Sequence, residues 1–511
     1  AAAHAAAAGA GWWQEAADSN QADWIFSQFR HVMLLNAAVT LGEGARTWLD
    51  DALLGGRITN ADFRLAIAPQ HFGAALPNDA VEVTFDYADA DVRFISTMTP
   101  LTEAAGSARL QGNRFDLTVD RGQVGAVAVS NGTVLLPRLS PKGATSVIRL
   151  EGRGAAQDVL RILEEEPIGL GERLPVDLAT VAGEGAFTFE LRRPMLSEVP
   201  VEDLRYTVEG AFTGVGARAR DRDVTLAGWD VSVVGDEQAL RLSGPLLVNG
   251  SPVTVDWTES LRDDEATPSR ILVSGVFDAA ELDRLGFSAT TLATGPIGVQ
   301  VRALGEGFDV DTGDLTLDLT AAAVSLPARL WDKPPGAPAQ AAFRVDRATD
   351  GFMLSDITLR SDGVAISGGQ ASFGADDSLR MARFDRIRIG DAIDTSLVAQ
   401  RRPDQVLDIR LNGAVFEAAR YLEDDPTPDA PSSVAAQVPA APSQRYAVTI
   451  DTARLRMRGG VDLHNATVVA ALRDDILVSL TAQALTAGGE PVRLAMGPRP
   501  DDPTGGVAFS T

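Results

Sequence analysis

The four histidines are the side chains with the clearest capacity for metal binding or proton transfer. They are His4, His31, His71 and His464, and they are far apart in the sequence. No His-x-x-x-His spacing occurs, and no acidic cluster lies near any of them at the spacing of a metal-ligand set. Each histidine is therefore expected to be a surface or packing residue, and the sequence predicts no metal site.

Two acidic segments could serve other chemistry. Asp309-Val-Asp-Thr-Gly-Asp314 resembles the start of a calcium-binding loop, but it lacks an acid at the twelfth position and flanking helices, so a hairpin turn is the better interpretation. Glu164-Glu-Glu166 could supply paired carboxylates, although three acids beside Pro167 are typical of a solvated helix end. There is also no cysteine, no Gly-x-Ser-x-Gly elbow and no phosphate-binding loop. The sequence therefore predicts a protein that is not an enzyme and that needs no cofactor.

The elements that would position any site are strands with one apolar face. In Val81-Glu-Val-Thr-Phe-Asp-Tyr87 the odd-numbered residues are apolar and the even-numbered residues are polar. Side chains alternate across a strand, so this period of two indicates a sheet with one wet face and one apolar face. The same pattern recurs in the segments 114–120, 186–191, 314–320 and 386–389.

Turn residues punctuate these strands. Dipeptides that tolerate positive φ recur along the chain, as hairpins and β-bulges require. These dipeptides are Gly112-Asn113, Asn131-Gly132, Asn249-Gly250, Asp362-Gly363 and Asn412-Gly413. Short strands with frequent turns favour antiparallel meanders over βαβ units, because they leave no room for crossover helices.

The predicted fold class is all-β and mainly antiparallel: an elongated, curved and repeating β-groove with a few short helices and a helical N-terminal segment. The expected parts are a flexible N-terminus with short helices (1–56), the repeating groove region (57–423), a Pro/Ala-rich linker or loop (424–444) and a further, truncated β region (445–511). A strand that ends in glycine leads into a short amphipathic helix at three places, which suggests a large modular repeat. These helices are expected near residues 155–163, 277–285 and 416–422.

Composition limits the partners. The net charge is −25 and no dense Lys/Arg cluster occurs, which argues against nucleic acid and against broad docking on an anionic membrane surface. Apolar residues make up 45% of the chain, which is ample for a core. There is no apolar run of about 18 residues and no initiator methionine. We therefore expect an excised piece of a longer protein whose membrane anchor lies elsewhere.

The segment Ala45-Arg-Thr-Trp48-Leu is followed by Gly55-Gly-Arg57-Ile. Together they resemble the opening of the large domain of unknown function of YhdP-like proteins, which belong to the TamB-related AsmA-like superfamily. The strand segments 115–122 and 244–257 resemble later parts of it, and residues from about 446 resemble the beginning of the AsmA-like C-terminal region. The resemblance covers roughly residues 45 to 511, and its motifs are strand patterns rather than catalytic signatures.

This resemblance implies a bacterial envelope protein with a long periplasmic β-structure shaped like a gutter, anchored in the inner membrane. The implied activity is carriage of phospholipids toward the outer membrane along that gutter. No catalytic residue is implied. The resemblance therefore makes phospholipid or another acyl lipid the expected ligand, the inner membrane an expected partner and the periplasm the expected location.

An apolar groove can bind acyl chains without specific contacts, because each buried methylene contributes about 0.8 kcal/mol. The residues expected to line it are Val81, Val83, Phe85, Phe115, Leu117, Val119, Phe187, Phe189, Leu315, Leu317 and Leu319. The alternative is that these side chains pack on one another in closed sandwiches, as in a non-catalytic scaffold for outer-membrane assembly. A carbohydrate-active β-helix enzyme ranks third, since neither its short coils of about 20 to 25 residues nor a cluster of acids is visible.

Overall fold

Strands that pair with their neighbours in sequence make up most of the described chain. The computed structural model describes residues 53–66, 79–93, 97–139, 141, 143–165, 176–196, 199–200, 203–220, 223–261, 268–307, 309–326, 330–419, 444–473, 476–498 and 507–510. The chain divides into two units: the first comprises residues 1–271 with 306–308, and the second comprises 272–305 with 309–511. The all-β, mainly antiparallel fold class is confirmed.

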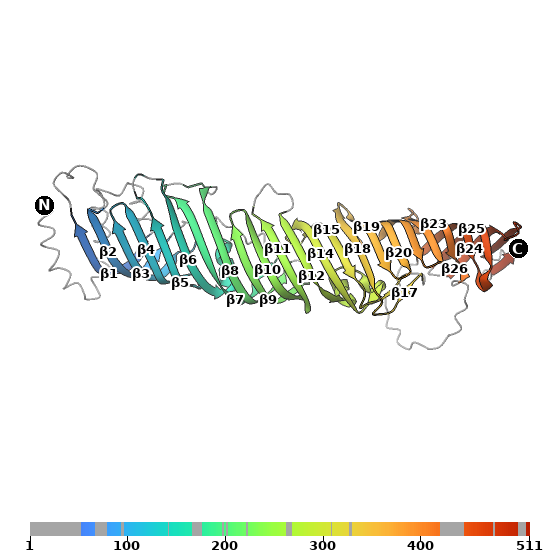
Figure 1. The fold of residues 1–511 in the computed structure, drawn as a ribbon, viewed down its shortest axis with the longest axis horizontal. Coiled ribbons are helices and arrows are strands. Elements are labelled where there is room, and N and C mark those ends of the chain that lie inside the picture. The colour runs from blue at the N-terminus through green and yellow to red at the C-terminus, as the bar shows by residue number, and fades with distance from the viewer. Residues whose placement is uncertain are drawn as a thin grey trace. The chain divides into compact units, whose positions relative to one another are not determined.

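In the first unit, each strand from β1 to β11 pairs antiparallel with the next one along the chain (Figure 1). The elements are β1 (Leu53–Leu65), β2 (Val81–Val92), β3 (Leu101–Gln111), β4 (Arg114–Val124), β5 (Val127–Leu136), β6 (Thr145–Ala155), α4 (Ala156–Leu163), β7 (Val176–Pro194), β8 (Arg205–Ala219), β9 (Thr225–Asp236), β10 (Ala239–Val248) and β11 (Ser251–Ser260). The boundary with the second unit falls within β12 (Ser269–Asp278).

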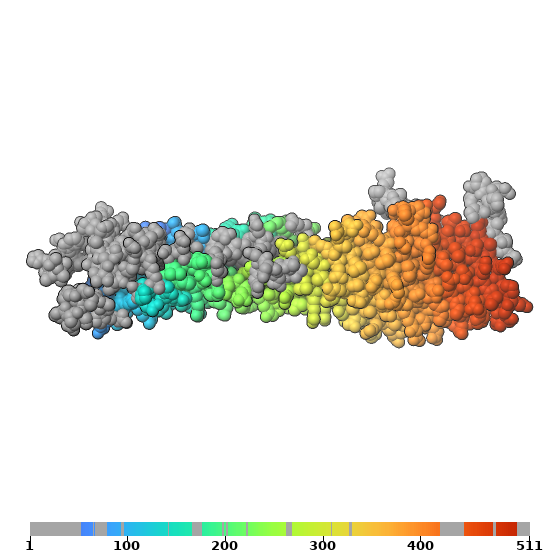
Figure 2. Space-filling view, turned by 90° about the horizontal axis from the view of Figure 1, so that it is seen from above, coloured from blue at the N-terminus to red at the C-terminus, as the bar shows by residue number. Residues whose placement is uncertain are grey.

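The second unit continues the same construction. Its elements are α5 (Ala279–Arg284), η4 (Ala289–Thr291), β13 (Ala293–Thr294), β14 (Pro296–Glu306), β15 (Asp309–Asp318), β16 (Ala323–Ser325), β17 (Asp332–Lys333), β18 (Ala339–Ala348), β19 (Gly351–Ser361), β20 (Val364–Gly374), β21 (Leu379–Ile389), β22 (Ile393–Arg401), β23 (Val406–Glu417), β24 (Arg445–Arg456), η7 (Arg458–Gly460), β25 (Asp462–Arg473), β26 (Ile476–Leu485), β27 (Pro491–Pro498) and β28 (Val507–Ser510). Within each unit, the colours follow chain order along the surface, as a meander requires (Figure 2).

β23 and β24 pair in parallel, whereas β24 to β28 return to antiparallel pairing. Val406 lies opposite Arg445 and Glu417 lies opposite Arg456. A parallel pair requires the chain to travel back to the same end of the sheet, which takes a dozen or more residues. The segment between β23 and β24 is long enough to do this, and it contains the region 424–444 that the sequence marks as a linker.

The turn dipeptides divide into hairpins and bulges. Asn249-Gly250 joins β10 to β11 as a two-residue hairpin, with φ of 48° and 92°, so that Val248 pairs with Ser251. Asn131-Gly132 instead lies inside β5, where the register against β6 shifts between Val129 and Asn131. The sequence pattern predicts both kinds of feature without separating them, because both use residues that tolerate unusual backbone geometry.

The helices are shorter than expected. α4 lies where a helix was expected over 155–163. In the 277–285 segment, β12 continues to Asp278, and α5 begins at Ala279. The Asp278 side chain caps the helix, because it accepts a hydrogen bond from the Ala280 amide at 3.0 Å. In the 416–422 segment, residues 416 and 417 belong to β23, and residues 420–422 lie outside the described part. Most of the expected N-terminal helical segment also lies outside it, but Leu53 already belongs to β1.

One apolar face of β2 to β7 is filled by its own side chains. A first cluster of buried residues comprises Val83, Leu110, Val134, Leu136, Leu139, Ile148 and Leu191. A second comprises Tyr87, Ala90, Leu101, Ala104, Val119 and Val129. The Tyr87 hydroxyl donates to the Thr118 carbonyl oxygen at 2.6 Å, and burial raises the pKa of Tyr87 well above its ordinary value, with the charge of Asp120 as a smaller cause. The phenol is therefore a neutral donor that joins the core to a backbone acceptor.

Lys333 is a buried cation in the second unit, with 3% of its surface exposed. It lies in β17, which forms a small three-stranded sheet with β13 and β16. Its Nζ, which carries three N–H donors, lies within hydrogen-bond distance of four backbone carbonyl oxygens, of Thr320 (3.2 Å), Ala322 (2.8 Å), Pro334 (3.0 Å) and Ala337 (2.8 Å). The Thr320 carbonyl also accepts from the Gly336 amide at 2.7 Å, so the lysine adds to the backbone hydrogen bonds of these loop segments.

Replacing Lys333 with Met should lower the free energy of unfolding of the second unit by about 1–3 kcal/mol, because buried carbonyls lose their donor. The measurement is hydrogen exchange of backbone amides over 320–338 during denaturant titration. Arg344→Met is the matched control: this guanidinium is 40% exposed and pairs with Asp314 and Asp346. The control should cost less than about 1 kcal/mol. Equal losses in the two variants would contradict the role assigned to Lys333.

Candidate functional site

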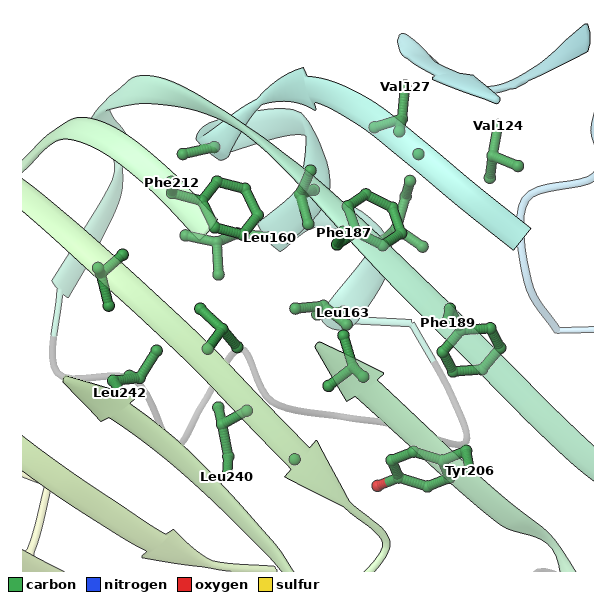
Figure 3. Close-up of a pocket in the computed structure, with 18 of the residues that line it drawn as sticks. Val124, Val127, Leu160, Leu163, Phe187, Phe189, Tyr206, Phe212, Leu240 and Leu242 are labelled. Atoms are coloured by element: carbon green, nitrogen blue, oxygen red, sulfur yellow. The ribbon is translucent and has the colours of Figure 1, made fainter. Parts of the chain in front are cut away.

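The first unit contains an apolar cavity of about 240 Å³. It lies against the inward-facing side chains of β5 to β11 and the ends of β3 and β4 at Leu101 and Val124, and α4 forms part of its wall (Figure 3). Its principal apolar lining residues are Val124, Val127, Val129, Ile148, Leu150, Val159, Leu160, Leu163, Phe187, Phe189, Leu191, Val208, Phe212, Val215, Trp229, Val231, Val233, Leu240, Leu242 and Trp257. The site is therefore a hydrocarbon-like space rather than a cluster of reactive groups.

Strand alternation builds the wall. On β7, the residues Phe187 and Phe189 point into the cavity, and on β8 the residues Val208 and Phe212 do the same (Figure 3 labels all but Val208). Their strand neighbours Thr207 and Glu209 are exposed on the other face. The period of two seen in the sequence is thus the direct cause of the apolar lining.

The outer face of the same strands is polar. Arg241 lies between two inward-facing leucines of β10, and its Nε donates to Asp256 Oδ1 of β11 at 2.9 Å. This hydrogen bond is the main reason that the pKa of Asp256 lies below its ordinary value, with the Arg241 charge adding to it and burial opposing it. The carboxylate is therefore fixed in its charged form on the wet side of the sheet.

A bare glycine lets the cavity accept an aromatic ring. A Cβ on Gly152 would lie 2.5 Å from the Cζ of Phe187, well inside contact distance. The Phe187 ring lies over the β6 backbone at that point, so β6 and β7 can keep their ladder while the ring faces the cavity. Any side chain at this position would push the ring away from the place it occupies.

α4 packs over the apolar face through Ala156 and Val159, which are buried. Leu160 and Leu163 of the same helix line the cavity (Figure 3). These positions recur at helical spacing, so one face of the helix is apolar. The Gln157 amide donates to the Leu178 carbonyl at 3.0 Å, which ties the helix start to β7.

The far end of α4 is held by Glu165. The Thr99 backbone amide donates to one carboxylate oxygen of Glu165 at 2.6 Å, and the Thr99 hydroxyl donates to the other. Glu164, beside it, is exposed. The acidic run that the sequence marks as a solvated helix end therefore contains one glutamate that ties the helix to the segment before β3; Glu166 lies outside the described residues.

Most polar groups of the cavity wall are engaged elsewhere. Asp236 accepts from the amides of Gln238 (2.8 Å) and Ala239 (3.0 Å), so it stabilises the β9–β10 turn. Among the described lining residues there is no lysine, arginine or histidine. Over the described chain as a whole, no group of three or more His, Asp or Glu side chains is arranged to hold a metal ion.

The other residues considered for chemistry lie apart from the cavity. His464 lies half-buried in β25 of the second unit, and the other three histidines are outside the described residues. The segment 309–314 forms the start of β15, where Asp314 accepts from Arg344 of β18 at 3.2 Å. The expectation of a hairpin turn there is wrong, because the turn precedes the segment at Gly307, where φ is 57°.

The expected groove residues are distributed over three places. Phe187 and Phe189 line the cavity. In the first unit, Val83 is part of the first buried cluster and Val119 is part of the second. The residues that pack on the first cluster from the side are Val81, Phe85, Phe115 and Leu117. In the second unit, β15 carries Leu315, which is buried, and Leu317, which is half-buried, and Leu319 is buried directly after the end of β15.

Sequence reasoning missed the part of the wall that β8, β9 and β10 supply. The signal was present, because Tyr206, Val208 and Phe212, and then Trp229, Val231 and Val233, alternate with exposed residues. Gly210 interrupts the run of apolar residues on β8, which makes this strand less apparent in the sequence. The sequence gives no means of choosing which of many apolar faces leaves space beside it.

A family model for the YhdP protein matches residues 38–490, which is most of the chain. The chain belongs to the YhdP family. This confirms the resemblance seen in the strand motifs and places the chain among bacterial envelope proteins of lipid-transport type. No curated protein and no solved structure matches the chain. In the part of this YhdP family member that the structure describes, no helix is both long enough and apolar enough to cross a bilayer.

Replacing Glu165 with Ala should free the end of α4, since Thr99 loses both of its acceptors. A hydrogen bond to a charged group contributes about 1.5–3 kcal/mol, so amides of α4 should exchange roughly tenfold faster or more. Glu164→Ala is the matched control, because it removes an exposed neighbouring carboxylate, and it should leave exchange unchanged. Hydrogen exchange read by mass spectrometry over residues 156–163 makes the measurement. Equal protection in both variants would show that the Thr99 contact does not hold the helix.

Proposed function

We propose that this chain is a periplasmic part of an inter-membrane lipid-transport protein and that the cavity of its first unit binds the acyl chains of phospholipids. The observation that carries the proposal is the cavity of about 240 Å³ with an almost wholly apolar wall. Hydrocarbon is favoured there because each methylene removed from water contributes about 0.8 kcal/mol. The proposed role contains no catalytic step.

The size and chemistry of the cavity support a hydrocarbon occupant. A cavity of roughly 150 Å³ lined by Leu, Ile and Phe stays dry and binds benzene. The cavity here is larger and has a similar lining, so it can take a stretch of acyl chain. The head group stays in water in this proposal, because no described lining residue is a cation that could pair with a phosphate.

Family membership supports the setting. A bacterial envelope protein of lipid-transport type meets phospholipids at the inner and the outer membrane, and we propose these membranes as the source and the destination. We propose that the full-length protein is anchored in the inner membrane, as the AsmA-like motifs imply. The net charge of −25 is compatible with a role in the aqueous space between membranes and unfavourable for binding nucleic acid or an anionic surface.

A non-catalytic envelope scaffold is the second candidate, and a specific observation favours it. The apolar face of β2 to β7 is occupied by two clusters of buried side chains, which need no ligand to exclude water. A scaffold of this kind would keep its cavity empty or filled only by small apolar molecules. The two functions therefore differ in whether purified protein carries lipid.

Replacing Val208 with Asp should reduce bound phospholipid by tenfold or more, because an acyl chain would then have to cover a carboxylate that needs water. Thr207→Asp is the matched control, since this neighbour on β8 is exposed on the opposite face. The control should keep its lipid. Native mass spectrometry of the purified chain, with lipid extraction of the same sample, gives the occupancy.

The wild-type chain decides the proposal even if Val208→Asp folds poorly. Co-purified phospholipid in the wild type and in Thr207→Asp, at comparable occupancy, is the expected result. A wild-type mass free of lipid in repeated preparations, which also stays free of lipid after incubation with phospholipid vesicles, would favour the scaffold. Undiminished lipid in a folded Val208→Asp variant would show that lipid binds somewhere other than this cavity.

A further inference from the structure

The indole of Trp229, a residue of the cavity wall, carries a buried hydrogen-bond donor that the described chain does not use. Trp229 lies in β9, lines the cavity and is only 8% exposed. Its Nε1 is buried and has no hydrogen-bond partner among the residues that the structure describes. Buried indole N–H groups normally find an acceptor, because leaving the group unpaired away from water is unfavourable.

The local backbone explains why the protein itself supplies no acceptor. The ladder between β9 and β10 is interrupted between Ser243 and Leu247, beside Trp229. Gly244 lies in this gap at φ of 148°, and a Cβ on it would stand 3.4 Å from the indole nitrogen and 2.0 Å from the Asp230 carbonyl oxygen. The bare glycine thus lets β10 approach β9 closely while it places no polar side chain on the indole.

A second indole in the same wall shows the contrast. Trp257 of β11 also lines the cavity and is 4% exposed. Its Nε1 donates to Glu259 at 3.2 Å, and the Ser269 hydroxyl donates to the same carboxylate oxygen. The fold therefore provides a buried acceptor for one cavity indole and none, among its described residues, for the other.

We infer that the Trp229 indole binds the carbonyl oxygen of an acyl ester, so that the ligand supplies the missing acceptor. This inference rests on the proposed function, and it adds that the cavity recognises the point where the acyl chain joins its backbone. In an acyl lipid, the ester carbonyl oxygen is the hydrogen-bond acceptor next to the hydrocarbon chain. An acyl chain that lies in the cavity therefore places this oxygen near the cavity wall.

A neutral ester fits the site better than a carboxylate does. No described lining residue is a lysine, arginine or histidine, so the charge of a free fatty acid would be buried without a partner. Asp236 is part of the wall, and its negative charge would repel a second carboxylate. A diacyl lipid carries no charge at its ester groups and avoids both costs.

The test compares two phospholipids that have the same head group and the same saturated chains, one ester-linked and the other ether-linked. The ether lipid keeps the hydrocarbon and lacks the carbonyl. The wild-type chain should bind the ester lipid about three- to tenfold more tightly, as a single hydrogen bond implies. Affinities are read by competition against a fluorescent phospholipid. A palmitate arm should show weaker binding than the ester; tighter binding would overturn the choice of a neutral ester.

Trp229→Phe should abolish the ester preference while it retains binding of the ether lipid. Trp257→Phe is the matched control in the same wall, and it should keep the preference, because its donor is already occupied by Glu259. Equal affinity of the wild type for ester and ether lipids would overturn the inference and leave the proposed function intact. Binding of neither lipid would remove the proposed function itself.

A measurement on the wild type avoids dependence on the stability of the variants. The chain has seven tryptophans, so ¹⁵N-tryptophan labelling gives a small set of indole signals, and the one missing in Trp229→Phe identifies Trp229. Its indole proton should shift downfield on addition of the ester lipid and not of the ether lipid. A shift of the same size with both lipids would contradict a bond to the carbonyl.

Discussion

Antiparallel pairing provides hydrogen-bond partners for the backbone of a sheet, but it does not remove the apolar face of the sheet from water. In the first unit the strands from β1 to β11 pair in sequence order, so most of their polar backbone groups are accounted for by the meander, apart from the positions where the register shifts. Alternation then places apolar side chains on one side along the whole series. Exposing all of these side chains to water would be unfavourable, so the apolar face has to be covered, and different parts of the unit cover it in different ways.

Three different solutions occur within this one unit. Along β2 to β7 the apolar side chains, together with small residues such as Ala90 and Ala104, bury one another in two clusters. Beside β6 and β7 a short helix lays its own apolar face on the sheet and is tied at both ends, by Gln157 and by Glu165. Between that helix and β8 to β10, neither solution fills the volume, and a cavity results. The cavity is therefore a consequence of where α4 ends and where the cluster-forming residues stop.

The strands themselves could be predicted from the sequence, because alternation and turn chemistry act over a few residues. The Asn249-Gly250 hairpin is an instance, since both residues adopt the positive φ that the dipeptide favours. The sequence predicts that an apolar binding surface exists, but it does not predict where the cavity lies. Val83 and Phe187 occupy equivalent positions in equally alternating strands, yet the first is buried by neighbouring strands and the second lines open space. That difference depends on Leu160, Phe212 and Leu240, which come from elements distant in sequence, and on Gly152, whose lack of a side chain admits the ring. Packing that depends on side chains from several distant elements cannot be read from the alternation of residues within one strand.

An apolar wall binds hydrocarbon in proportion to the area it covers and distinguishes poorly between occupants, so any selectivity must come from the few polar atoms within it. In this cavity the fold has engaged nearly all of them internally: Thr99 with Glu165, Asp236 with a turn, and Trp257 with Glu259. Each such bond removes a potential anchor for a polar group of an occupant. Under the proposed function, a carrier needs binding that is favourable enough to take up a lipid yet weak enough to release it, and a wall whose described polar groups are mostly engaged meets both demands. The sparse polarity of the cavity is thus the property that would separate a conduit from a tight lipid-binding site.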